Sequence, residues 1–579
     1  MPVKHALVFS AAINLFFMVL CLVFGDIKFG AIDDYFMAAV LTGAHGTDYN
    51  PHLLFVNAIY GYALLPLYYL FPKIGWYYVG EILAVFLSFV SIGFVLLRRC
   101  GYRWGSILTM LFTAMFASDF YLVLQFTQCA SILSAAGMLL FAYGVVSKNS
   151  NAGLLDTLSL QNDFWGRLKA AVPFILGVFL ILWGSVMRWP AFLMGLPFFC
   201  VGFLFLFKQC WKSKWLVLAG LVVAFAGAYV MHCFDESLYR NAEYAPYVDI
   251  QEARATVGDG TNYNQNAVYE DLEEIGKSGR DYHMLTEWIF YDTETFAADS
   301  IRSMMGTLYH YRTMIDKGKI PQMLLQALGH SLQSPLFWVW FIFCLLIWLT
   351  NRRKFLYLWV SLAVILCLMA TLLAMDRLVY RVESGFWLYA AVLAIPLWGR
   401  FRFELPRKLT VVIVAVIAIF NVLNYAASGE QVRGPVSGEM RTLAVEDSTD
   451  YEQVFAYIDS QPDKMFLLSM NAYMRFSHHK NPPYLAEPIG SYRRTVSFGY
   501  WTPYLPEITQ TLAEFGITNP IKDVVHDNVV VINEDRLGDF LQRHYYDSVA
   551  IDTLKVIGAI NFYKYRLVQS ADSAMKGDE

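Results

Sequence analysis

The stretch ALVFSAAINLFFMVLCLVF, Ala6 to Phe24, decides the fold because it is an apolar segment, with only Ser10 and Asn14 as polar residues, that is long enough to cross a bilayer. Similar segments recur at 76–97, 104–122, 128–146, 170–187, 191–207, 215–232, 335–350, 355–375, 386–399 and 409–427, which makes eleven predicted spans. The 579-residue chain is 57% hydrophobic and 16% charged, whereas soluble domains are roughly 25% charged. The sequence therefore predicts a mainly α-helical, polytopic membrane protein, and its first segment lacks the cleavage site of a signal peptide.

The topology depends on a twelfth apolar stretch, 53–71, which contains Asn57, Pro66 and four tyrosines. This stretch is either a span or a helix lying in the membrane interface. If it does not span, the short loops on one side hold 16 basic residues, and those on the other side hold only Lys28, Lys73, Arg188, Arg377 and Arg381. Because basic loops favour the cytoplasm, we expect a cytoplasmic N-terminus.

This topology gives the domain organisation. We expect a transmembrane domain over 1–427, with a first external loop at 26–75 and a large external loop at 233–333, and an extracytoplasmic domain over 428–579. The large loop has 16 acidic and 8 basic residues, and its half from Tyr282 to Leu332 predicts amphipathic surface helices.

The C-terminal region predicts one small α/β or α+β domain. Apolar runs predict strands at 465–468, 529–532 and 557–565, and amphipathic patterns predict helices at 451–460, 506–515 and 534–544. The eight cysteines lie in or beside apolar segments or in short basic loops, so no disulfide framework is expected in the soluble parts.

Several functional classes have no support in the sequence. It contains no phosphate-binding loop, no dinucleotide-binding glycine fingerprint, no HExxH and no Gly-x-Ser-x-Gly. We therefore expect neither nucleotide hydrolysis nor a nucleic-acid partner. No Asn-x-Ser/Thr sequon is present, which disfavours a glycosylated eukaryotic lumenal domain.

The candidate catalytic residues are Asp33 and Asp34, in Gly30-Ala31-Ile32-Asp33-Asp34-Tyr35 of the first external loop. A carboxylate at the membrane surface can act as a general base. The alternative is that both residues cap a short helix beginning near Tyr35. We slightly favour Asp34 as the base, because Asp33 lies nearer the expected N-cap.

Other polar residues also fall at the outer surface. Asp119 lies near the end of the third apolar segment and either ends a helix or lines a site. His45 and His52 flank a loop in which Asn50-Pro51 marks a turn. Either histidine can bind a phosphate or a divalent metal ion. Their spacing is not that of a metal site, and no other cofactor is indicated.

Three arginines are expected on the external side, where the short loops hold few basic residues. They are Arg188, in Met187-Arg188-Trp189-Pro190, and Arg377 and Arg381, in the segment 376–381. A guanidinium group can hold a phosphate by paired hydrogen bonds and stabilise an anionic leaving group. The alternative is that Arg377 pairs with Asp376 or Glu383, or that these side chains reach towards lipid headgroups.

In layout over roughly 1–427, and in the motifs Ile32-Asp33-Asp34-Tyr35, Met187-Arg188-Trp189-Pro190 and Arg377 to Arg381, the chain resembles the GT-C superfamily of membrane glycosyltransferases. The resemblance implies an inverting transfer from a polyprenyl-phosphate sugar to a glycan or lipid acceptor, in a bacterial plasma membrane. It implies Asp33 or Asp34 as the base and Asp119 as a second acidic residue. The chain lacks the Trp-Trp-Asp signature of oligosaccharyltransferase subunits, which disfavours that branch.

Two other classes compete with a transferase. A transporter or flippase of lipid-linked saccharides would place ionisable groups deep within its spans, whereas the polar residues here gather outside. A surface receptor could bind saccharide through the tail motifs Tyr492-Arg493-Arg494 and Phe498-Gly499-Tyr500-Trp501, which we interpret instead as domain core and turn residues.

Overall fold

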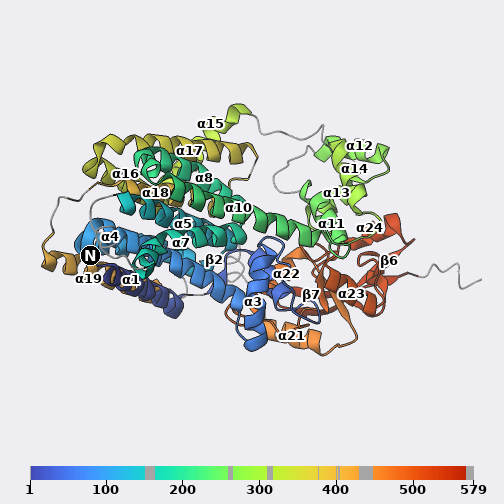
Figure 1. The fold of residues 1–579 in the computed structure, drawn as a ribbon. Helices are drawn as coiled ribbons and strands as arrows, with labels where there is room; N and C mark the ends of the chain where they lie inside the picture. The colour runs from blue at the N-terminus through green and yellow to red at the C-terminus, as the bar shows by residue number, and fades with distance from the viewer. Residues whose placement is uncertain are drawn as a thin grey trace, which may run out of the picture.

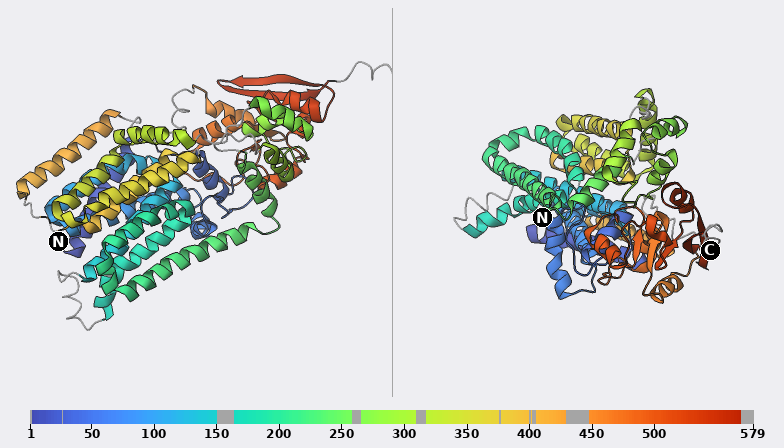
Figure 2. Two further views of the ribbon diagram at one scale, coloured as in Figure 1. Left: turned by 90° about the horizontal axis from the view of Figure 1, so that it is seen from above. Right: turned by 90° about the vertical axis from the view of Figure 1, so that its right-hand side faces the viewer.

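A bundle of long helices carries helical loops and a β-sheet at one end (Figure 1). The computed structural model describes residues 2–25, 27–149, 164–257, 265–308, 317–375, 377–399, 401, 405–428 and 448–568. The N-terminus lies at one end of the bundle, and the helices of the large loop lie at the other end, beside the C-terminal sheet (Figures 1 and 2). The large loop and the tail therefore share one face of the bundle.

Helical structure occupies all eleven predicted apolar segments. The helices are α1 Val3–Phe24, α4 Trp76–Tyr121, α5 Phe126–Asn149, α7 Phe164–Met187, α8 Trp189–Phe205, α10 Lys214–Tyr239, α16 Pro335–Thr350, α17 Leu356–Ala374, α18 Tyr380–Ala394 and α19 Arg407–Ser428. Helix α4 contains two of the segments, and Gly101, with φ 73° and ψ 179°, interrupts it between them. The side chain of an ordinary L-residue would be strained at that positive φ.

Six helices of the described chain are long and apolar enough to span a membrane, or seven if the pair α15 Ile320–Gln333 and α16, bent by 82°, counts as one span. A multi-pass helical protein is therefore confirmed, whereas eleven spans stay a prediction. Helix α3, Ala58–Leu70, covers the ambiguous twelfth stretch with 13 residues. At 1.5 Å per residue it is about 20 Å long, shorter than the roughly 30 Å hydrocarbon core, which favours the interfacial interpretation.

The first loop is fixed at its start by a short strand pair. Strand β1, Lys28–Phe29, runs parallel to β2, Val123–Leu124, which lies between α4 and α5. Helix α2 then covers Ile32–Leu41, and its N-cap is Ala31, without a side-chain cap. The expectation that an aspartate caps a helix beginning near Tyr35 is therefore wrong: both aspartates lie within the first turn.

The large loop contains helices α11 Ala245–Ala255, α12 Gln265–Glu274, α13 Gly279–Thr286 and α14 Ala298–Leu308 before α15. Trp288 is not helical and has a φ of 64°, so the predicted helical pattern through it is wrong. Tertiary contacts explain the difference. The backbone N–H groups of Phe290 and Tyr291 both donate to the Phe498 carbonyl of the tail, at 3.0 and 2.8 Å.

The tail forms a five-stranded mixed sheet of order β4-β3-β5-β7-β6. Its strands are β3 Met465–Leu468, β4 Thr495–Ser497, β5 Val529–Ile532, β6 Val549–Ile557 and β7 Ile560–Leu567, and its helices are α21 Tyr451–Asp459, α22 Met470–Lys480, α23 Pro506–Glu514 and α24 Leu537–His544. The apolar runs predicted β3 and β5 residue for residue. They missed β4, β6 and α22. Residues 429–447, at the start of the predicted extracytoplasmic domain, lie outside the described residues.

The two faces of strand β3 belong to different cores. Met465 and Leu467 join the cluster of buried residues that continues into the membrane helices, whereas Phe466 and Leu468 pack with α21 and α22. Alternate residues of a strand point to opposite faces, so this short strand connects both layers. The tail therefore packs firmly on the first loop and the bundle.

The shared face gives a topology prediction. In a background with the exposed Cys200, Cys233 and Cys367 replaced by serine, we expect cysteines at Asp48, Arg280 and Asp527 to react with an impermeant reagent from outside. Cysteines at Arg103 and Arg353 should react only after permeabilisation, because basic loops stay cytoplasmic. Labelling of Asp48→Cys and Asp527→Cys from opposite sides would contradict the topology.

Candidate active site

Asp33 joins the first loop to the tail. Its half-buried carboxylate accepts hydrogen bonds at Oδ1 from the Tyr500 hydroxyl at 2.5 Å and from Trp501 Nε1 at 3.0 Å. Tyr500 is held in a tight turn with a φ of 63°, an uncommon conformation for a non-glycine residue. The tail motif that we interpreted as core and turn therefore contributes directly to the surroundings of Asp33.

Asp34 points into the protein and is fully buried. Its Oδ1 accepts from the Tyr77 hydroxyl and from the Phe126 N–H, both at 3.1 Å. Burial raises the pKa of Asp34 well above its usual range, and the neighbouring Asp33 charge adds to that rise, while the Phe126 and Tyr77 hydrogen bonds and Arg381 oppose it. The two aspartates thus have different environments, one open to the tail and one closed.

Arg188 lies on the same side as Asp33. Its guanidinium carbon is 5.3 Å from the ring centres of both Phe55 and Phe126, and Nη1 donates to the Phe55 carbonyl at 3.3 Å. The charges of Asp33 and Arg381 both act on Arg188. Arg381 is exposed, and its charge also acts on Asp34. The structure therefore brings four predicted residues together: Asp33, Asp34, Arg188 and Arg381.

The rings of Phe55, Trp288 and Trp501 form an aromatic wall. The centre of the Trp501 ring lies 4.8 Å from that of Phe55 and 5.7 Å from that of Trp288, and the interplanar angle is 80° in both pairs. Arg254, from α11, lies over both tryptophan rings. Aromatic faces and guanidinium groups attract one another, so segments from the first loop, large loop and tail meet beside Asp33.

The other predicted site residues, Asp119, Arg377 and His52, lie outside this group of contacting residues. Asp119 is buried at the C-terminal end of α4, where its Oδ2 accepts from the Tyr380 hydroxyl at 2.8 Å. This bond fixes the first residue of α18, next to Arg381. Arg377 is exposed, and its backbone N–H donates to the Leu372 carbonyl at 2.8 Å. In the same segment, the charge of Arg381 acts on Asp34.

His52 belongs to the contact between the first loop and the large loop. Its ring stacks on Tyr244 at 4.2 Å, and Nδ1 is 2.7 Å from Asn50 Oδ1. Burial lowers the pKa of His52 to about 4. Asn50 in turn donates to Glu507 of the tail. Among the described residues no cluster of three or more His, Cys, Asp or Glu could hold a metal ion.

No family model and no curated sequence matches the chain. One solved structure is similar over almost its whole length: ArnT from Cupriavidus metallidurans bound to undecaprenyl phosphate. The match covers 97% of this chain and 98% of that one, at 11% identity and a TM-score of 0.37. These values are too low to place residues, so the roles proposed below rest on the geometry of this chain.

Sequence reasoning missed two contributors to the site. Glu81, in the second turn of α4, is fully buried and lies within hydrogen-bonding reach of Asp34. The sequence could have singled out Glu81, because a lone carboxylate in an apolar segment is energetically unfavourable and therefore indicates a functional or paired residue. Arg254 carried no such signal, since one arginine in an acidic external loop is ordinary.

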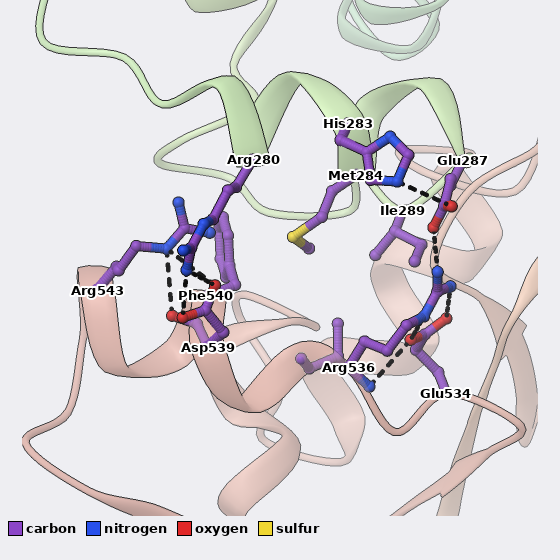
Figure 3. A pocket seen from close by; sticks show the side chains of 11 residues that line it. Arg280, His283, Met284, Glu287, Ile289, Glu534, Arg536, Asp539, Phe540 and Arg543 are labelled. Atoms are coloured by element: carbon purple, nitrogen blue, oxygen red, sulfur yellow. Dashed lines mark hydrogen bonds and ion pairs between the residues drawn. The ribbon is translucent and has the colours of Figure 1, made fainter. Parts of the chain in front are cut away.

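A separate cavity of about 180 Å³ lies between α13 and α24 (Figure 3). Arg280 donates to Asp539 at 2.8 Å, and Arg536 bridges Glu287 and Glu534. These ion pairs connect the large loop to the tail just before Trp288. The cavity therefore belongs to the contact that positions the aromatic wall.

Two buried histidines make the contact between first loop and tail sensitive to acid. His45 stacks on Tyr492 at 5.5 Å, and burial, with a smaller effect of Lys480, lowers its pKa to about 3. Burial also lowers the pKa of His478 to about 3, with Lys28 and His479 adding to the effect. Within the part of the chain that the structure describes, neither ring has a hydrogen-bond partner.

We expect the free energy of unfolding to decrease as the pH falls below about 6.5, because the unfolded histidines then bind protons that the folded ones exclude until about pH 3. Thermal unfolding from about pH 8 to about pH 5 measures this. His45→Phe keeps a ring against Tyr492 and cannot titrate, so its melting temperature should depend less on pH. An unchanged slope in this variant would exclude His45 as a contributor.

Proposed function

We propose that this protein is a membrane glycosyltransferase of GT-C type, which moves a sugar from a polyprenyl-phosphate carrier to a hydroxyl group of a cell-surface glycan or lipid at the external face. The observation that carries the proposal is the position of Asp33. A half-buried carboxylate, the guanidinium groups of Arg188 and Arg381, and an aromatic wall meet where the first loop lies on the bundle.

Each group has a role that fits the transfer of a sugar from a lipid phosphate. Asp33 accepts the proton of the acceptor hydroxyl as its oxygen attacks the anomeric carbon. The bond between that carbon and the phosphate oxygen breaks on the opposite side, which gives inversion. Arg188 and Arg381 stabilise the charge that develops on the leaving phosphate, and the Phe55 and Trp501 rings offer apolar faces to the sugar or the carrier.

The tail orients the Asp33 side chain. Two donors from the tail hold one oxygen of the carboxylate, and this fixes its orientation. The second oxygen then remains for the acceptor hydroxyl. Asp119 acts at a distance in this scheme, because its bond to Tyr380 holds the start of α18 and therefore Arg381.

The proposal is tested with purified protein and a panel of radiolabelled polyprenyl-phosphate sugars. We expect at least one donor to be hydrolysed slowly, or its sugar transferred when membrane lipids or glycans are added. Wild-type protein that binds none of the donors and releases no sugar would overturn the assignment. Uptake of intact lipid-linked saccharide by proteoliposomes, without release of sugar, would instead support a transporter.

The two arginines of the segment 376–381 form a matched pair. We expect Arg381→Ala to weaken donor binding by about 1.5–3 kcal/mol, the usual loss for a charge-assisted hydrogen bond, or roughly 10- to 150-fold. Arg377→Ala should have a smaller effect, because Arg381, in the first turn of α18, is the arginine whose charge acts on both Asp34 and Arg188. Binding of a polyprenyl phosphate to detergent-solubilised protein measures both. Equal affinities in wild type and both variants would reassign the two residues to structural roles.

A further inference from the structure

Asp34 and Glu81 are two carboxyl groups buried against each other without enough donors. Both residues are 0% exposed, and the Glu81 carboxyl lies within hydrogen-bonding reach of Asp34. Tyr77 and the Phe126 N–H occupy Asp34 Oδ1. Asp34 Oδ2 and both oxygens of Glu81 have no donor from the described residues. Three acceptor oxygens therefore remain unsatisfied if both groups are ionised.

A single proton resolves this arrangement. Two negative charges at hydrogen-bonding distance repel one another strongly in a buried site, and a buried acceptor without a donor is unfavourable. A proton on one carboxyl removes one charge and supplies the missing donor at the same time. Asp34 already accepts two hydrogen bonds that favour its ionised form, whereas Glu81 accepts none, so the proton belongs on Glu81.

We propose that Asp34 and Glu81 share one proton, with Glu81 donating to Asp34 Oδ2, and that this pair positions Asp33. The ionisable groups that face the pair are Asp33 on α2, Tyr60 on α3, Tyr77 and Tyr78 on α4, Cys129 on α5 and Arg381 on α18. Apart from Asp33 and Arg381, these groups are neutral at pH 7. They offer no second cation that could balance an ionised Glu81.

The pair connects three elements at the point where α2 begins. Asp34 lies on α2, Glu81 on α4, and the Phe126 N–H opens α5. The positive end of the α5 dipole favours the charge on Asp34. With Asp34 fixed on three sides, the adjacent Asp33 is directed towards Tyr500 and Trp501. Asp34 is then a positioning residue, and Asp33 is the base.

The shared proton is tested independently of any sugar transfer. We expect the infrared difference spectrum between wild type and Glu81→Gln at about pH 7 to contain the C=O stretching band of a protonated carboxylic acid. Other buried carboxyl groups cancel in this difference. A spectrum that shows only the loss of a carboxylate band would mean that Glu81 is ionised, and it would overturn the shared proton.

The hydrogen bond itself is tested by a matched pair of variants. Glu81→Gln keeps a donor for Asp34 Oδ2, and Glu81→Met has a similar length but no donor. We expect Glu81→Gln to unfold at the wild-type temperature and Glu81→Met to unfold about 2–4 °C lower. Equal melting temperatures for these two variants would overturn the donor role of Glu81.

The positioning of Asp33 rests on the proposed transferase, whereas the proton and the melting temperatures do not. Where a donor substrate is found, Glu81→Met should reduce kcat by up to roughly 10²-fold, whereas Glu81→Gln should keep kcat close to the wild-type value. If neither variant changes kcat while the infrared band is present, the pair is purely structural. If no donor is turned over, the proposed function fails and the shared proton still stands.

Discussion

We expect the replacement of Asp33 with Asn to reduce sugar transfer by roughly 10²–10⁴-fold, the usual contribution of a general base. Asparagine keeps the shape of the side chain and still accepts hydrogen bonds from Tyr500 and Trp501 through its carbonyl oxygen. It cannot take the proton of the acceptor hydroxyl. Expression and melting temperature should therefore stay close to wild type while kcat falls, in an assay with the donor identified from the panel.

Asp34→Asn provides the control within the same turn. The buried Asp34 carboxylate is turned away from the tail, and its Oδ1 is occupied by Tyr77 and Phe126. An asparagine there retains both hydrogen bonds at its carbonyl oxygen and can donate to Glu81. We expect this variant to lose far less activity than Asp33→Asn. The reverse order would make Asp34 the base, and wild-type rates in both variants and in the double variant would remove the pair from the chemistry.

The two aspartates show which features of the site the sequence could predict and which it could not. The motif Ile32-Asp33-Asp34-Tyr35 placed two carboxylates beside the membrane surface, but the ranking of the two rested on a helix beginning near Tyr35. The helix begins at Ile32 because β1 pairs with β2 and delivers an extended backbone to Ala31. That pairing joins residues almost a hundred positions apart, and nothing in the local sequence encodes it.

Local patterns predicted what depends on local chemistry. The apolar segments became helices, and the four-residue apolar runs at Met465 and Val529 became β3 and β5, because a strand buried on both faces needs no alternation. Strand β6 was missed because Asp552, Thr553 and Lys555 interrupt its apolar residues without a regular alternation, and most of the strand is exposed. Trp288 followed a helical pattern, yet the pairing of Phe290 and Tyr291 with Phe498 holds it in a turn.

The candidate site was only partly predictable for the same reason. Asp33, Arg188 and Arg381 could be selected by residue type and side of the membrane. Their neighbours could not, because the bond between Tyr500 and Asp33 spans 467 positions of the chain. Glu81 is the exception. A carboxylate in a segment that must lie among apolar helices is unfavourable without a polar partner, so its presence predicts one.

The second large effect on sugar transfer is expected from changes where the tail contacts Asp33. We expect the double variant Tyr500→Phe and Trp501→Phe to lose transfer by roughly 10²-fold, because a carboxylate without fixed donors no longer holds its reactive geometry. Each single variant removes one hydrogen bond to a charged group, worth about 1.5–3 kcal/mol. The phenylalanine rings preserve much of the packing against Phe55 and Trp288. Steady-state kinetics should show the loss mainly in kcat.

The control is Tyr504→Phe, a change in the same tail loop that leaves the Asp33 bonds intact. Tyr504 packs on Tyr291 at 5.2 Å and has a φ of 64°, like Tyr500. This variant should transfer sugar at the wild-type rate. If the double variant does so as well, the tail does not orient the base. A chain that ends after residue 430 could then retain transfer and lose only selectivity for its acceptor. If the double variant fails and the control does not, the tail completes the active site, and the contact at Asp33 is where the membrane domain and the tail act as one enzyme.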